Sequence, residues 1–310
     1  MLKHRLISGL SLVGFICAFV FWPHRLASVL FLIFGLGLVI LAMREFFQIA
    51  KGVGAPGYRR TTLVAGVALA LVPALVTAFP AVRGLLGDPD QPQAVAAFLD
   101  FAIIGIFLLS CFSILFRSPD FEVGVRGFFA SAAGFFYVGW TMAFLSRIFF
   151  FGYDWDPQTG ASGSYLFLYV VLVTKFGDIG GYAVGNIASK RAGGNHKIIP
   201  RVSPGKSWEG LCGSVLFSVG IALFLSYAFG THLNPGNAGA LSGWQNVFVA
   251  VFMALLGLVS DLTESVLKRA GKVKDSGSSI PGLGGVLDAV DSLLLVAPVF
   301  YCYLLFATSR

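Results

Sequence analysis

The stretch WEGLCGSVLFSVGIALFLSYAFG, residues 208–230, decides the class of fold. After Glu209 it carries no charged residue, and it is long enough to cross the hydrocarbon core of a bilayer, which takes roughly 17 to 25 helical residues. Its apolar run is continuous rather than alternating, which favours a helix over a strand of a membrane barrel. Residues 208–230 therefore predict a transmembrane α-helix.

The rest of the chain repeats this pattern. Hydrophobic residues make up 56% of the sequence and charged residues only 12%, whereas soluble domains contain about 25% charged residues. Similar apolar runs fall at 6–22, 26–43, 62–80, 95–116, 127–150, 164–186, 245–265 and 287–308. Together with residues 208–230 they predict an all-α, polytopic membrane protein with about nine transmembrane helices.

The positions of Lys and Arg predict the orientation of these helices, because cytoplasmic loops carry the excess of both residues. With the N-terminus inside, 17 Lys and Arg residues fall in inner segments and 4 in outer segments. The outer residues are Arg25, Arg83, Arg147 and Arg310. The N-terminus is therefore expected on the cytoplasmic side. No small-residue cleavage site follows span 6–22, which is expected to remain as an anchor.

Ionisable residues are distributed unevenly, which divides the chain into two regions. Residues 1–160 hold five spans with few ionisable groups inside the membrane, and they are expected to form a lipid-facing scaffold. Residues 161–310 hold four spans and two basic inner loops. This second region is expected to be catalytic.

Two pairs of charged residues lie in or beside the spans of the second region. Lys175 and Asp178 are three residues apart on one helical face, where charge is costly, so they predict either a functional cavity or a buried ion pair between helices. Asp288 and Asp291 are also three apart at the start of a helix, and their carboxylates could share one Mg²⁺ ion. Helix capping by Asp288 is the alternative.

Two further segments add polar groups at the same membrane face. In SDLTESVLKR, residues 260–269, four polar residues project from one helical stripe: Asp261, Glu264, Ser265 and Lys268. The segment SPGKSWEG, residues 203–210, ends like a phosphate-binding P-loop, but the required first glycine is Pro200 and no strand pattern precedes it. Cations near helix N-termini favour phosphate, carboxylates favour Mg²⁺, and apolar walls admit lipid tails. The combination predicts an enzyme that reacts a Mg²⁺-nucleotide with a phospholipid.

Residues 260–292, SDLTESVLKRAGKVKDSGSSIPGLGGVLDAVDS, resemble the signature of the phosphatidate cytidylyltransferases, roughly S-x-x-K-R-x-x-x-x-K-D, P-G-H-G-G and D-R-x-D. The matching residues are Ser265, Lys268, Arg269, Lys274, Asp275, Pro281, Gly282, Gly284, Gly285, Asp288 and Asp291. Residues 177–210 are similar to a second block of that family. Leu283 and Ala289 stand where the family usually has histidine and arginine. Either neighbours such as Lys272 or Arg201 carry the cationic functions, or the chain is a divergent branch.

The resemblance implies a reaction and a set of roles. A phosphate oxygen of phosphatidate would attack the α-phosphorus of CTP, giving CDP-diacylglycerol and pyrophosphate for phospholipid biosynthesis, with Mg²⁺ as cofactor. It implies metal and catalytic roles for Asp261, Asp288 and Asp291. It implies that the catalytic residues Lys268, Arg269 and Lys274 hold phosphates. It implies that the catalytic residue Asp275 supports the loop. The implied substrate-binding residues are Asp178, Ser203, Lys206, Glu209 and Ser265.

Two other classes of function remain as alternatives: a CTP-dependent polyprenol or lipid-alcohol kinase, and a membrane transporter with intramembrane charges. The paired acidic residues and the Lys-Arg motif favour the transferase, and no inverted repeat supports a transporter. The expected setting is a bacterial inner membrane, with the active site facing the cytoplasm. CTP, phosphatidate and membrane lipid are the expected partners, no nucleic acid is expected, and a homodimer stays open.

Overall fold

The structure, a computed structural model, describes residues 14, 20, 25–86, 92–151, 161–190, 194–233, 241–280, 282 and 284–308. In this part of the chain the elements are all helices, and β-type pairing is limited to two isolated bridges, Lys197 with Ser207 and Ile280 with Gly284. The first expected span, 6–22, lies outside the described residues apart from Gly14 and Val20.

The described helices account for the other expected spans. In chain order they are α2 (Arg25–Gly52), α3 (Arg59–Ala78), α4 (Pro80–Leu86), α5 (Pro92–Phe116), α6 (Phe121–Ala133), the π-helix η1 (Gly134–Trp140), α7 (Thr141–Phe149), α8 (Ala161–Ser189), α9 (Trp208–Leu233), α10 (Gly243–Ala270), α11 (Val286–Val290) and α12 (Leu293–Thr308). Among the described residues, 8 segments are long and apolar enough to cross a membrane, and each overlaps one of the last eight expected spans. The all-α, polytopic prediction is confirmed.

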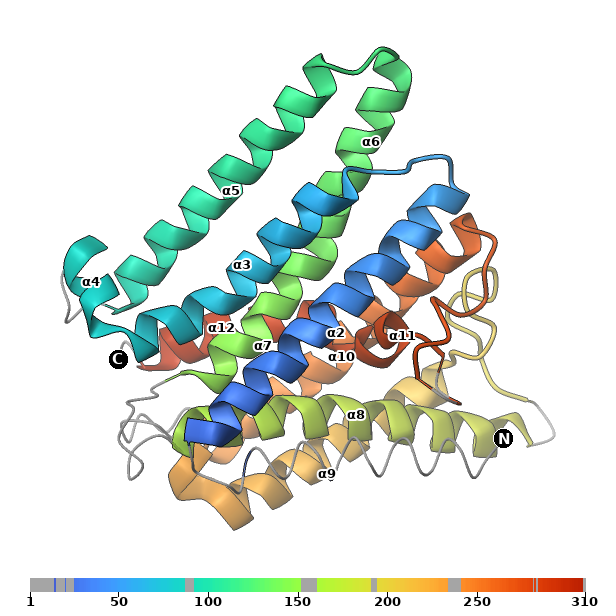
Figure 1. Cartoon of the computed structure of the whole chain (residues 1–310). Coiled ribbons are helices and arrows are strands. Elements are labelled where there is room, and N and C mark those ends of the chain that lie inside the picture. The colour runs from blue at the N-terminus through green and yellow to red at the C-terminus, as the bar shows by residue number, and fades with distance from the viewer. Residues whose placement is uncertain are drawn as a thin grey trace.

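The helices form two groups (Figure 1). Helices α2, α3, α5 and the continuous α6–η1–α7 segment pack alongside one another, and α8 pairs with α9 across one end of this group. The α8–α9 pair makes close backbone contact through glycines: a Cβ atom added at Gly180 would lie 2.6 Å from the carbonyl oxygen of Gly213. Small residues allow such close approach between membrane helices.

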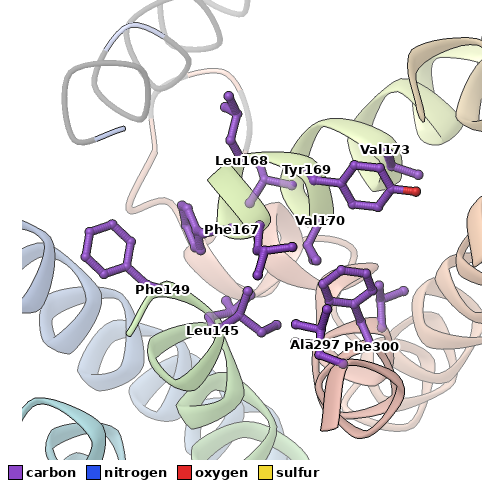
Figure 2. Packing of buried hydrophobic residues seen from close by; sticks show 14 of the residues in the cluster. Leu145, Phe149, Phe167, Leu168, Tyr169, Val170, Val173, Ala297 and Phe300 are labelled. Atoms are coloured by element: carbon purple, nitrogen blue, oxygen red, sulfur yellow. The ribbon is translucent and has the colours of Figure 1, made fainter. Parts of the chain in front are cut away.

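A buried aromatic and aliphatic cluster joins the two groups (Figure 2). Phe149 of α7, Phe167 and Tyr169 of α8 and Phe300 of α12 converge in it. The one polar group that Tyr169 brings into this cluster is satisfied, because its hydroxyl donates to Asn246 Oδ1 at 2.6 Å. The cluster fixes α8, which carries polar residues of the candidate site, and α12, which directly follows others, against the first half of the chain.

Arg147 is not a loop cation, although the charge count places it in an outer segment. It lies inside α7 with 7% of its surface exposed, and its Nη2 donates to both carboxylate oxygens of Asp100 in α5 at 2.5 Å. Its guanidinium carbon lies 4.8 Å from the ring centroid of Phe144. Without Arg147, the outer segments hold three of their 4 Lys and Arg residues, and the inner segments hold 17. The cytoplasmic N-terminus stays a prediction.

Candidate active site

The two charged residues of α8 contact the segment that follows α11. Lys175 Nζ lies 3.2 Å from Asp178 Oδ2 and 3.7 Å from Asp291 Oδ1. It also donates to Ser292 Oγ at 2.7 Å, and that hydroxyl donates to Asp178 Oδ2 at 2.8 Å. The pair on α8 therefore forms part of a larger polar cluster that includes the end of the family-like signature.

A cavity of about 170 Å³ lies beside this cluster, between α8, the N-terminal part of α9 and the turn before α9. Its lining residues are Gly177, Asp178, Gly181, Tyr182, Ser203, Gly205, Lys206, Ser207, Gly210, Leu211, Ser214 and Leu258. Three of the predicted substrate-binding residues, Asp178, Ser203 and Lys206, thus share one cavity. Its several glycines leave backbone atoms accessible to a ligand.

Lys206 connects this cavity to α10, because its ammonium forms an ion pair with the carboxylate of Asp261. Burial alone would lower the pKa of Lys206, but the carboxylates of Asp261, Asp178 and Asp291 together outweigh burial and raise that pKa above its ordinary value. Lys206 is therefore positively charged at neutral pH. Its cation is available to phosphate at the cavity wall.

Glu209 and Ser265, also predicted to bind substrate, do not line the cavity. The Glu209 carboxylate accepts hydrogen bonds from the backbone N–H of His196, at 3.1 Å, and contacts the His196 ring Nδ1 at 2.6 Å. It thereby ties together the loop that carries Lys206. Ser265 Oγ lies 3.4 Å from Asp261 Oδ1. Their roles in substrate binding stay predictions.

Three carboxylates converge at the centre of the site. Asp261 and Glu264 of α10 and Asp291, which follows α11, each place an oxygen within 4.8 Å of the other two. Glu264 is fully buried, and neither of its oxygens accepts a hydrogen bond from the described residues, although it forms an ion pair with Lys268. The sequence prediction named Asp261 and Asp291 as metal ligands but missed Glu264. Its place on the polar stripe of residues 260–269 was the available signal.

Asp288 lies outside this group, although it is predicted to be a ligand of the same ion. Its Oδ1 accepts a hydrogen bond from Lys268 Nζ at 2.7 Å. Its Oδ2 accepts bonds from the backbone N–H groups of Ser276 and Gly285, both at 2.8 Å, and lies 3.0 Å from Ser276 Oγ. The Asp288 carboxylate therefore holds Lys268 and the α10–α11 loop, residues 271–285. Its role as a metal ligand stays a prediction.

The other signature residues lie on the periphery or outside the described part. Arg269 is exposed, and its Nε lies 3.4 Å from the carbonyl oxygen of Val202. Lys274 and Asp275 are exposed on the α10–α11 loop. Pro281 and Leu283 lie outside the described residues. The catalytic roles expected for Arg269, Lys274 and Asp275 therefore stay predictions.

One residue of the site comes from the region predicted to be a scaffold. Glu45 of α2 is 3% exposed, and its carboxylate accepts hydrogen bonds from the α10–α11 loop and the start of α11. Only its position as a lone acidic residue inside an apolar helix marks it in the sequence. The division into regions 1–160 and 161–310 stays a prediction, and Glu45 shows that the first contributes to the loop of the second.

The charges of the cluster fit a divalent cation. Five carboxyl groups face three lysine ammonium groups, so the acidic groups outnumber these lysines by two. These residues are Asp178, Asp261, Glu264, Asp288 and Asp291, with Lys175, Lys206 and Lys268. Carboxylate oxygens are the ligands that Mg²⁺ prefers, and buried charge is stable only when compensated. The Asp261–Glu264–Asp291 group therefore has suitable chemistry for such an ion.

Comparison with known proteins identifies similar sequences along the whole chain. The sequence model of the Cytidylyltransferase family matches residues 3–307. A phosphatidate cytidylyltransferase of Haemophilus influenzae is 37% identical over 155 residues, which are 50% of this chain and 49% of that protein. The uncharacterised protein YnbB of Escherichia coli is 30% identical over 203 residues, 65% of this chain and 61% of that protein. A phosphatidate cytidylyltransferase of Staphylococcus aureus is 28% identical over 292 residues, 93% of this chain and 95% of that protein.

Proposed function

Because the chain belongs to the Cytidylyltransferase family, we propose that it transfers the cytidylyl group of CTP to phosphatidate, giving CDP-diacylglycerol and pyrophosphate. The observation that carries this proposal is the shared site of Asp261, Glu264, Asp291 and their lysines, built largely from residues 260–292, beside a cavity lined by Lys206. Anionic phosphates, a divalent cation and a lipid substrate all find matching chemistry there.

The proposed reaction is a displacement at the α-phosphorus of CTP. An oxygen of the phosphatidate phosphate forms the new P–O bond, and the bond between the α-phosphorus and the bridging α–β oxygen breaks, so that pyrophosphate leaves with the bonding electron pair. The nucleophile is already an anion, so no side chain has to remove a proton from it. The contribution of the chain is then to position the two phosphates and compensate their charge.

Lys206 and Lys268 are placed to do this at different carboxylates of the acidic group. Lys206 reaches the cavity wall and pairs with Asp261, while Lys268 pairs with Glu264 and Asp288. On phosphate binding, each lysine exchanges a carboxylate partner for a phosphate oxygen. The carboxylates are thereby freed to hold a cation.

Mg²⁺ is the cofactor that we propose for the Asp261–Glu264–Asp291 group. When bound there it would neutralise charge on the transferring and leaving phosphates. The resemblance also assigns Asp288 to this ion. In the structure the Asp288 oxygens already accept hydrogen bonds, one of them from Lys268.

The lipid substrate is proposed to enter from the side. Tyr182 lines the cavity and is 77% exposed, and Ile179 and Phe176 are exposed on the same membrane-spanning helix. An apolar surface beside a cationic cavity suits a molecule with acyl chains and a phosphate head. We place this multi-pass protein in a bacterial inner membrane, with the cavity open to the cytoplasm, where CTP is found.

The fate of the CTP phosphates tests the proposal. Purified protein in detergent–phosphatidate micelles with Mg²⁺ is expected to move label from α-labelled CTP into the organic phase. With γ-labelled CTP the label should stay in aqueous pyrophosphate. Label from the γ-phosphate in the lipid would instead establish a lipid kinase, and label from neither position in the lipid would refute the proposed reaction.

A further inference from the structure

Glu45 binds the α10–α11 loop and the start of α11 at four points. Its Oε1 accepts a hydrogen bond from Ser279 Oγ at 2.6 Å and from the backbone N–H of Val286 at 3.1 Å. Its Oε2 accepts one from Ser276 Oγ at 2.9 Å and from the backbone N–H of Leu287 at 2.8 Å. A carboxylate is a pure acceptor, so all four donors are matched to it.

The loop is shaped around this carboxylate. A Cβ atom added at Gly277 would lie 2.6 Å from Glu45 Oε1, and one added at Gly285 would lie 2.3 Å from Oε2. Both positions therefore require glycine for Glu45 to reach the backbone. The next turn of α2 continues the contact, because Ile49 and Gly52 pack against Gly271 at the start of the loop.

Ser276 links Glu45 to the charged centre. Its hydroxyl lies 2.9 Å from Glu45 Oε2 and 3.0 Å from Asp288 Oδ2, and it has a single proton to donate. Its backbone N–H donates to Asp288 at 2.8 Å, and Asp288 in turn holds Lys268. Displacement of Ser276 therefore moves the partner of a lysine that faces the acidic group.

We propose that Glu45 is a positioning residue: its carboxylate fixes the α10–α11 loop so that Asp288 and Lys268 are held in the geometry needed for phosphate transfer. This inference rests on the proposed function. It assigns an active-site task to α2, which lies far from the signature in the sequence.

Substitutions at Glu45 separate the charge of the side chain from its volume. In Glu45→Gln the amide keeps the volume but has one acceptor oxygen, so its NH₂ group must face the fixed backbone N–H of either Val286 or Leu287. Glu45→Asp keeps both acceptor oxygens and the charge but withdraws them by about 1.5 Å. If the carboxylate positions the loop, Glu45→Asp retains more activity than Glu45→Gln. If Glu45 only fills space, the order is reversed.

Hydrogen exchange measures how well the backbone amides of the loop are protected from solvent, and this measurement does not depend on enzymatic activity. In purified Glu45→Gln protein, peptides covering residues 276–287 should exchange about tenfold faster or more, because a buried hydrogen bond to a charged group contributes about that factor to an equilibrium constant. Peptides from α3 and α8 should be unchanged. Unchanged exchange in residues 276–287 overturns the proposed contact.

The rate of cytidylyl transfer measures the effect of loop displacement on activity. We expect kcat/KM of Glu45→Gln to fall by about a hundredfold, since a displacement of about 1 Å at a reacting group has an effect of that size. Glu122→Gln is the matched control, because Glu122 is exposed and, among the described residues, forms an ion pair only with Arg126 on its own helix. Faster loop exchange with kcat/KM within twofold of wild type refutes the positioning role.

The experiment remains decisive if the wild-type protein is inactive or if Glu45→Gln does not fold. If wild-type protein transfers no cytidylyl group, the proposed function fails, and hydrogen exchange alone still decides whether Glu45 holds the loop. If Glu45→Gln does not fold, Ser279→Ala removes one of the four donors and should give smaller changes in the same direction. No change in loop exchange or kcat/KM for Ser279→Ala, with Glu45→Gln unfolded, restricts Glu45 to a structural role and overturns the proposal.

Discussion

Replacement of Gly180 by alanine tests whether the closeness of α8 and α9 shapes the substrate cavity. The new Cβ would lie 2.5 Å from Phe217 Cγ and 2.6 Å from the carbonyl oxygen of Gly213. Ordinary carbon contacts are about 3.5 Å, so the two helices must separate by roughly 1 Å. Gly177 and Gly181 line the cavity one turn or less away, and they would move with the helix.

The expected energies follow from this clash. Overpacking costs about 1–3 kcal/mol, whereas alanine gains about 1 kcal/mol over glycine inside a helix, which leaves a loss of stability of up to about 2 kcal/mol. The cavity change should lower kcat/KM for CTP by about tenfold or more, because Lys206 and the α8 wall no longer keep their spacing.

The assay compares this variant with a matched one on the partner helix. Gly220→Ala has open space around its new Cβ, so it should keep wild-type kcat/KM and thermal stability in detergent. Both properties are measured for both variants by cytidylyl transfer and by a fluorescence melt. If Gly180→Ala matches Gly220→Ala in both measurements, the close glycine contact does not shape the cavity and our reasoning is wrong.

Three further predictions concern the charged residues and the membrane topology. Asp291→Asn should abolish transfer at saturating Mg²⁺ while membrane insertion stays intact, and wild-type turnover by the purified variant would remove Asp291 from the site. In a cysteine-free background, an impermeant thiol reagent applied to intact cells should label Ser242→Cys but not Lys197→Cys, and the opposite pattern would invert the topology. Arg147→Leu should destabilise the fold by about 3–5 kcal/mol by leaving Asp100 unpaired, measured as a fall in melting temperature. Adding Asp100→Leu should recover most of that loss, and failure to recover it would mean that packing rather than charge explains the effect.

The spans were predictable because hydrophobic length is a local property. Residues 208–230 alone indicate a helix that the structure extends by only three residues, to Leu233. Helical spacing also put Lys175 beside Asp178 and Asp261 beside Ser265, since i, i+3 and i, i+4 neighbours share a face in any helix.

Contacts between distant segments were not predictable in the same way. Equal spacing predicts that Asp288 and Asp291 share one ion, but it could not predict that the Asp288 carboxylate accepts hydrogen bonds from Ser276 and Lys268. Arg147 lies near the end of a span, so the charge count could not distinguish it from a loop residue. Glu45 has no motif around it, and its role depends on donors that only the tertiary fold brings to it.

The bonds of Glu45 also impose an order on the synthesis of the protein. Its donors follow it by 231 to 242 residues, so α2 leaves the ribosome long before the loop that it binds exists. At about 5–20 residues per second, this interval lasts roughly 10 to 50 s. Throughout it, α2 carries a carboxylate whose final donors have not been made, and water or lipid headgroups must solvate it. Completion of the site is therefore a late event of biogenesis, which occurs when the last helix docks and not when the early helices insert.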